Sequence, residues 1–178
     1  MKGKKKNNNW IYMVFIITFI LSMVFGGLSN TILNNLNIEW AIILLLIMIS
    51  IGILFDIIGV AVATNDISPF TAKASRKHKG AKEAIFLIKN TDKVTNICND
   101  IVGDICGIVS GAIGALLSIE LNNILNWDIV LISLLVGSVI SSITVFGKAL
   151  GKGYAIKNNT NIVYKVGRII HFMFKNEK

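Results

Sequence analysis

The sequence predicts an all-α, polytopic helical membrane protein with about four transmembrane helices, a cytoplasmic surface helical belt and a C-terminal juxtamembrane amphipathic helix. The first observation behind this prediction is hydropathy. Of 178 residues, 53% are apolar and the mean hydropathy is +0.66, more than a soluble domain of this size can cover with polar surface. The second is charge: all 18 Lys and Arg fall in three blocks separated by apolar stretches.

The three basic blocks predict the topology. Residues 2–6 hold four of the basic residues, and residues 73–93 and 148–178 hold seven each, whereas the short loops at about 30–39 and 120–128 hold none. With four spans all three blocks fall on one side, which the positive-inside rule assigns to the cytoplasm. We therefore expect a multi-pass protein of the cell membrane with both termini cytoplasmic. The net charge of +8 then follows from topology, and no nucleic-acid partner is expected.

The apolar stretches have the lengths that spanning helices need, about 20 residues or more. Trp10, Trp40 and Trp127 stand where interfacial anchors are expected, at the start of the three spans that carry them. The expected segments are a basic cytoplasmic tail at 1–9, a first span at 10–31, further spans at about 40–64, 94–121 and 127–147, a belt at 65–93 and a juxtamembrane helix at 158–178.

The belt and the C-terminal segment carry helical patterns without spanning length. Ser68-Pro69 predicts a helix start with Ser68 as the N-cap. Apolar residues at helical spacing then predict one or two surface helices: Ala81, Ala84, Ile85 and Ile88. The C-terminal segment has a longer apolar face with Lys165 and Arg168 as snorkelling cations, formed by Ile162, Val163, Val166, Ile169, Ile170 and Met173.

Three acids lie inside apolar spans: Asp56, Asp100 and Asp104. An ionised group there costs at least ~2.5 kcal/mol at a helix centre. One interpretation is a site of hard oxygen ligands for Mg²⁺, Ca²⁺ or Mn²⁺. A second is pairing with Lys148, or with Asn96 and Asn99, which would fix the helix register. A third is protonation by desolvation.

Other residues of the third span predict packing. Gly103, Gly107 and Gly111 repeat every four residues, a spacing that lets another helix approach closely. Cys98 and Cys106 lie in the same apolar segment and are expected to be buried thiols.

The sequence offers no signature of an enzyme. The two histidines, His78 and His171, lie in basic cytoplasmic stretches and are expected to be solvated. No nucleophile–base pair and no metal-ligand histidine cluster is present, so we do not expect an enzyme.

Three segments, in order, resemble the membrane domain of the cyclin-M and CorB/CorC magnesium transporters. They are Phe55–Ala61 (FDIIGVA), Lys79–Val94 (KGAKEAIFLIKNTDKV) and Phe146–Ile170 (FGKALGKGYAIKNNTNIVYKVGRII). In that family the first helix typically carries F-S-x-x-E-x-A, a basic belt has a G-x-x-A pattern and an L-x-x-N turn, and F-G-E-x-x-P-K precedes a juxtamembrane helix. The resemblance makes residues 40–157 the family domain and the span at 10–31 an addition.

The resemblance implies a homodimer that binds dehydrated Mg²⁺ in the membrane, with Co²⁺ as a second candidate ion. The serine of the family's first motif falls at Asp56 and its glutamate at Gly59. The glutamate of the last motif falls at Lys148, its proline at Gly151, and its lysine is kept as Lys152. A cation thus replaces an acid near the expected metal path, which makes Lys148 and Lys152 candidates for an ion pair or a gate.

The family's second-helix asparagine has three candidate positions here, Asn99, Asp100 and Asp104, which with Asp56 form the candidate metal site. The leading hypothesis is divalent-cation transport or binding. The alternative is a non-transporting scaffold or accessory subunit, in which an Asp56–Lys148 pair replaces the metal. The chain ends at Lys178, short of the family's usual cytoplasmic regulatory domains, so nucleotide-linked control is expected to need a separate regulatory subunit.

Overall fold

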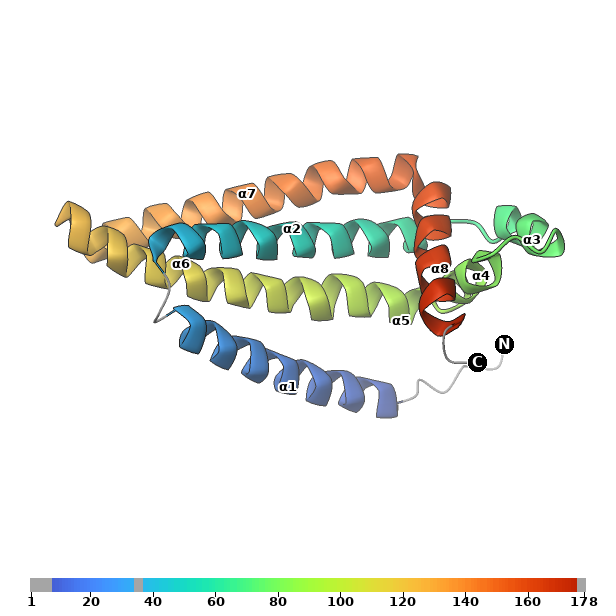
Figure 1. Ribbon diagram of the computed structural model, residues 1–178, viewed down its shortest axis with the longest axis horizontal. Helices are drawn as coiled ribbons and strands as arrows, with labels where there is room; N and C mark the ends of the chain where they lie inside the picture. The colour runs from blue at the N-terminus through green and yellow to red at the C-terminus, as the bar shows by residue number, and fades with distance from the viewer. Residues whose placement is uncertain (1–7, 34–36, 176–178) are drawn as a thin grey trace. The chain divides into compact units, whose positions relative to one another are not determined.

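The computed structural model describes residues 8–33 and 37–175, and this part of the chain is helical with no strand. The all-α prediction is therefore confirmed for the described residues. Most of the predicted tail at 1–9 and the last three residues lie outside them. The helices (Figure 1) are α1 Asn8–Leu33, α2 Ile38–Ala63, α3 Ser68–Ser75, α4 Ala81–Lys89, α5 Thr91–Thr95, the π-helix η1 Asn96–Val102, α6 Gly103–Leu125, α7 Ile129–Lys157 and α8 Asn159–Lys175.

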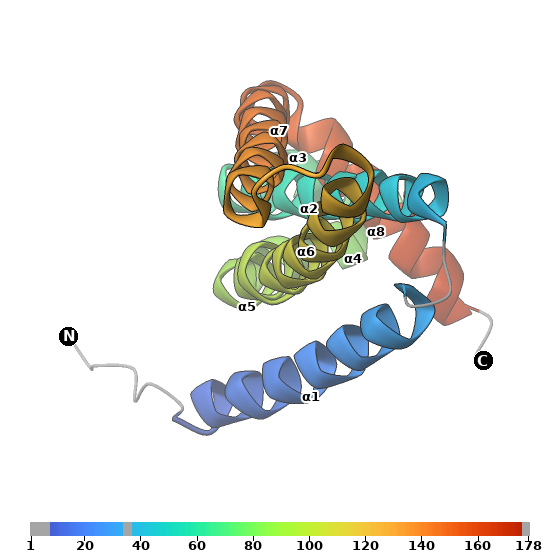
Figure 2. The same ribbon diagram turned by 90° about the vertical axis from the view of Figure 1, so that its left-hand side faces the viewer.

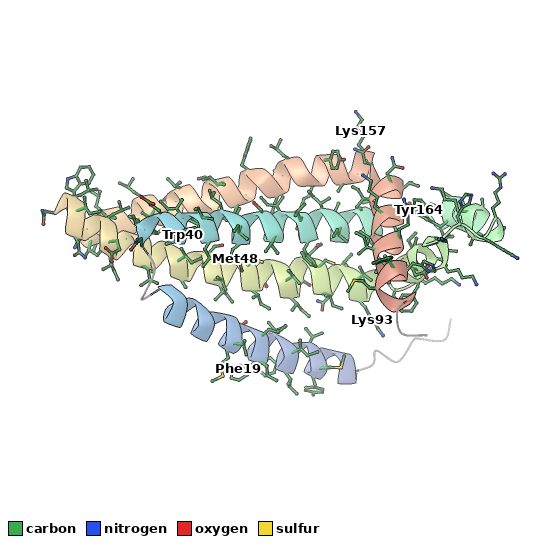
Figure 3. The ribbon with its side chains drawn as sticks, in the orientation of Figure 1. Phe19, Trp40, Met48, Lys93, Lys157 and Tyr164 are labelled. Atoms are coloured by element: carbon green, nitrogen blue, oxygen red, sulfur yellow. The ribbon has the colours of Figure 1, made fainter. Side chains whose placement is uncertain are left out.

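Three helical stretches are long and apolar enough to cross a membrane: Ile38–Ala63, Thr91–Leu125 and Ile129–Lys157. They correspond to the second, third and fourth predicted spans. In α1 the apolar stretch found within the described residues is shorter, Tyr12–Val24. Exposed apolar side chains such as Phe19, 63% exposed, project from it (Figure 3). The predicted span at residues 10–31, which corresponds to α1, therefore stays a prediction.

Two helix ends differ from the sequence-based expectation. The last span was expected to end at Gly147, but α7 continues to Lys157. Gly147 and Gly151 do not break the helix because they pack against Ile53 and Ile57 of α2, where a Cβ at Gly151 would come within 2.8 Å of Ile57 Cγ1. The close contact with α2 replaces the helix propensity that these glycines lack.

The predicted cap of the first belt helix was also wrong. Ser68 makes no N-cap; instead Asp66 Oδ1 accepts the backbone N–H groups of Ile67 at 2.6 Å and Ser68 at 3.4 Å, and Ser68 Oγ donates to Asp66 Oδ2 at 3.0 Å. These hydrogen bonds, that from the Ser68 hydroxyl foremost, lower the pKa of Asp66. A carboxylate at a helix start also suits the helix dipole, so Asp66 takes the role expected of Ser68.

The chain divides into two compact units. Unit 1 comprises Met1–Met48 and Ile105–Ile140, and unit 2 comprises Ile49–Asp104 and Ser141–Lys178. Within unit 1, α6 packs closely on α7: a Cβ at Gly114 would come within 2.6 Å of Ile140 Cδ1. A side chain at Gly114 would therefore require the end of the Ile140 side chain to move.

Unit 2 has its core where the end of α2, the belt helices, the end of α7 and α8 meet. Phe70 of α3, Val62 of α2 and Val163 of α8 are fully buried in it. Burying a side chain of this size contributes about 1.5–3 kcal/mol. Within this unit α8 packs on α4 and runs across the direction of α7 (Figures 1 and 2). Lys93 and Lys157 lie at the end of the unit where α8 crosses (Figure 3).

Candidate cation site around Asp56 and Asn99

Asp56 is the buried acid of α2. The helix is apolar almost throughout, with Glu39 in its first turn as the other acid. The Asp56 side chain is 5% exposed, and its Oδ2 atom has no hydrogen-bond partner among the described residues. A buried carboxylate oxygen without a donor is costly unless a cation or a proton reaches it. The position therefore suits the binding of a cation.

Gly59 lies one turn after Asp56 on the same face of α2. A Cβ at Gly59 would collide with the side-chain oxygen of Asn99 and would lie 2.8 Å from its Cγ and 3.1 Å from its Nδ2. The glycine thus leaves room for the Asn99 amide to pack against the α2 backbone. The carboxylate of Asp56 and the amide of Asn99 consequently share one face of α2.

Asn99 is carried by the π-helix η1, which the sequence did not predict. This seven-residue stretch joins α5 to α6, and such π-helical turns within longer helices often mark functional sites. The side-chain oxygens of Asn96 and Asn99 are both buried and lack a hydrogen-bond partner within the described residues. Asn96 Nδ2 donates to Asp100 Oδ2 at 2.7 Å. Together with Asp56 Oδ2, these two amide oxygens make three buried side-chain oxygens in the described part of unit 2. Each can accept a hydrogen bond or bind a metal.

Lys148 brings a positive charge to the same region of unit 2. Its side chain is half-buried, and its Nζ lies 3.7 Å from the position that a Cβ on Gly103 would take. Gly103 begins α6 four residues after Asn99, so the ammonium group lies against the helix that carries the amide. The described residues show no ion pair between Lys148 and Asp56. Lys148 and Asp56 are thus carried by different helices, α7 and α2, and do not neutralise each other in a direct pair.

The remaining candidate residues lie elsewhere. Asp100 and Asp104 are exposed, as is Lys152 on α7. No group of three or more His, Cys, Asp or Glu side chains gathers as a metal site in the described part of the chain. The structure therefore places Asn99 against Gly59, one turn from Asp56 on α2, and leaves Asp100 and Asp104 at the surface.

The three glycines that repeat every four residues in the third span also differ in burial. Gly103 is buried against the Lys148 side chain, whereas Gly107 and Gly111 are exposed with open space around the position of a Cβ. The two cysteines, Cys98 and Cys106, are both buried, as predicted, and are not joined in a disulfide.

The belt contains a contact that sequence reasoning missed. His171 Nδ1 of α8 lies 2.7 Å from Glu83 Oε1 of α4, so His171 is not simply solvated. Burial alone would raise the pKa of Glu83, but the hydrogen bond and charge of His171 and the charge of Lys82 outweigh it and lower that pKa. The partners are 88 residues apart, and no local pattern could have indicated them.

Two further contacts hold the belt to α8. The Lys73 ammonium of α3 lies 4.1 Å from the ring centre of Tyr164, a cation–π contact. Asn159 Nδ2, at the start of α8, donates to the backbone oxygen of Thr64 at the end of α2, at 2.8 Å. Together these contacts join the first belt helix and the end of α2 to the C-terminal helix.

The described residues thus define an all-α chain with three helices long and apolar enough to cross a membrane and a buried polar site in unit 2. Comparison of the chain with protein-family models, curated proteins and solved structures finds no match. The buried polar site and the motif resemblance are therefore the features that indicate a function.

Proposed function

We propose that the chain is a multi-pass protein of the cell membrane, with both termini cytoplasmic, that binds a hard divalent cation, Mg²⁺ first and Co²⁺ second, and transports it across the bilayer. The observation that carries this proposal is the buried Asp56 carboxylate with an unpartnered oxygen on the face of α2 where Asn99 packs. Carboxylate and amide oxygens are the ligands that such ions prefer. Water molecules would complete the coordination of the ion, since Mg²⁺ keeps several of its waters.

The order of the three family-like motifs supports the proposal, although the expected ligands stand at different positions in this chain. The resemblance expects a glutamate where this chain has Gly59. Here the glycine admits the Asn99 amide instead, and the acid stands one turn earlier as Asp56. The site would thus keep one carboxylate and one amide oxygen. Lys148 supplies a positive charge against Gly103, four residues after Asn99, and this charge would repel a cation that approaches it.

The test is Mg²⁺ flux into proteoliposomes, followed with an entrapped fluorescent indicator. Asp56→Asn and Asn99→Leu are each expected to lower flux roughly tenfold or more. Asp56→Asn removes the negative charge and one carboxylate oxygen, and Asn99→Leu removes the amide oxygen, in each case from a low-dielectric site. The matched control is Asp92→Asn, the same change at an exposed acid of α5, which should retain flux. No flux above empty liposomes for the unaltered chain contradicts transport.

The second candidate is a non-transporting scaffold or accessory subunit with an internal Asp56–Lys148 pair. The position of the Lys148 ammonium beside Gly103, one turn from Asn99, favours it. If it holds, Asp56→Asn combined with Lys148→Met unfolds at higher temperature than either single variant, since each single change leaves one buried charge. Stabilisation by millimolar Mg²⁺ that disappears in Asp56→Asn argues for the cation site instead.

A homodimer and a separate cytoplasmic regulatory subunit are the partners we propose besides the bilayer. Gly107 and Gly111 of α6 are exposed and meet no atom of the described chain within 4 Å of a Cβ position. Glycines at this spacing allow close approach of a helix from a second copy. The open space at Gly107 and Gly111 therefore supports the proposed homodimer.

A further inference from the structure

The helix α8 has one face that unit 2 uses and one that it leaves open. On the inner face Val163 is fully buried, and a Cβ at Gly167 would lie 3.0 Å from the backbone nitrogen of Ala84 on α4. Val166 and Ile170 pack against the same core. Most of the apolar face predicted from the sequence is thus packed against other helices of unit 2.

The open face carries Lys165, Arg168, Ile169 and Phe172, spaced so that they form one stripe along the helix. Ile169 is 59% exposed and Phe172 is 71% exposed. The four side chains line a shallow hollow of about 450 Å³. Two long cations followed along the helix by two large apolar side chains make this surface amphipathic.

Within the described residues, no ion pair neutralises the charge of this stripe. The α8 sequence contains no Asp or Glu. Neither Lys165 nor Arg168 makes an ion pair within the described ranges, and Glu83, the acid of α4 that reaches α8, is held by His171 instead. An anionic ligand is therefore the complement that the stripe lacks.

The direction of α8 indicates which anionic ligand is available. In unit 2 it runs across α7 (Figures 1 and 2), so it lies along the membrane surface if α7 crosses the bilayer. Lys93 and Lys157 lie at the same end of the unit (Figure 3). At this level the abundant anions are phospholipid headgroups, and their neighbours are acyl chains that accept Ile169 and Phe172.

We infer that the stripe Lys165–Arg168–Ile169–Phe172 is a docking surface for anionic phospholipid of the cytoplasmic leaflet. Lys165 and Arg168 bind the lipid phosphate, and Ile169 and Phe172 enter the boundary between headgroups and acyl chains. The inference rests on the membrane placement in the proposed function and is independent of the cation site.

The test uses the full chain in a non-ionic detergent, titrated with phosphatidylglycerol or phosphatidylcholine, with bound lipid measured by native mass spectrometry in the absence of divalent metal. The unaltered chain is expected to prefer phosphatidylglycerol. Lys165→Gln combined with Arg168→Gln should weaken phosphatidylglycerol binding roughly 30-fold, about fivefold for each basic residue at an anionic surface. Phe172→Ala should weaken both lipids, because it removes apolar contact alone.

The matched control is Arg76→Gln combined with Lys79→Gln, which removes one Arg and one Lys from exposed positions of the belt and should keep the preference. Equal binding of the two lipids by the unaltered chain overturns the inference, as does an equal loss in the control. Full displacement of phosphatidylglycerol by inorganic phosphate identifies a free-anion site and also overturns it. A chain that stays soluble without detergent would instead contradict the membrane placement itself.

Discussion

Gly59 shows how one residue determines the chemistry of the candidate site. The Asn99 amide occupies the space that any side chain at this position would need. Its buried, unpartnered oxygen then lies beside the face of α2 that carries Asp56. The missing methyl group is therefore as important to the proposed site as the ligands themselves.

Gly59→Ala is expected to destabilise the chain by about 1–3 kcal/mol, because the new methyl group must displace the Asn99 amide from a packed interface. Mg²⁺ flux should fall with it. Gly153→Ala of α7 is the control, since a Cβ there meets no atom of the described chain; it should be neutral or stabilising by up to about 1 kcal/mol. Thermal unfolding in detergent measures both. An unchanged Gly59→Ala variant would show that the amide does not depend on this space.

At the scale of the element, α4 and α8 are joined by both apolar packing and the Glu83–His171 contact. The apolar part comes from the predicted helical faces, and Ala84 and Val163 are both fully buried in the shared core. The polar part adds direction, because it fixes the last turns of α8 against one position of α4.

Glu83→Gln is expected to lower stability at neutral pH and to have less effect in acid. The pKa of Glu83 is lowered from its ordinary 4.5 in the folded chain, so the ionised carboxylate stabilises the fold above that pH. This contribution is lost as the pH falls through the lower folded-state value. Melting temperatures of the two chains should therefore converge below pH 4.5. A gap that stays constant, or one equalled by Glu120→Gln at an exposed position of α6, contradicts the assignment.

The helices differ in how far their sequences predicted them. Length and hydropathy were enough for α2 and α7, and the period of apolar residues was enough for α8, because these signals are local. The π-helix η1 was missed since a change from one hydrogen-bond period to another leaves no clear trace in composition. The end of α7 was missed because its glycines are stabilised by contact with α2, which is distant in sequence.

The same distinction holds for the candidate site. Asp56 was found from the sequence because an acid in an apolar span is conspicuous. The pairing of Gly59 with Asn99 depends on how two helices pack and could not be read from either one. Asp100 and Asp104 were indistinguishable from Asn99 by spacing. The packing of η1 buries the Asn99 oxygen, whereas Asp100 of η1 and Asp104 of α6 are exposed.

For the whole molecule, the number of spans decides on which side the N-terminus lies. Three helices are long and apolar enough to cross, and α1 has 26 residues, about 39 Å at 1.5 Å per residue, which is also sufficient length. Because Lys2 and Lys4–Lys6 precede α1, the positive-inside rule favours a fourth span and a cytoplasmic N-terminus.

Reporters active in the cytoplasm alone, fused separately to each terminus, should both be active. An active C-terminal reporter with an inactive N-terminal one would leave three spans and place α1 outside; replacing the four lysines by glutamine tests whether their charge sets this orientation.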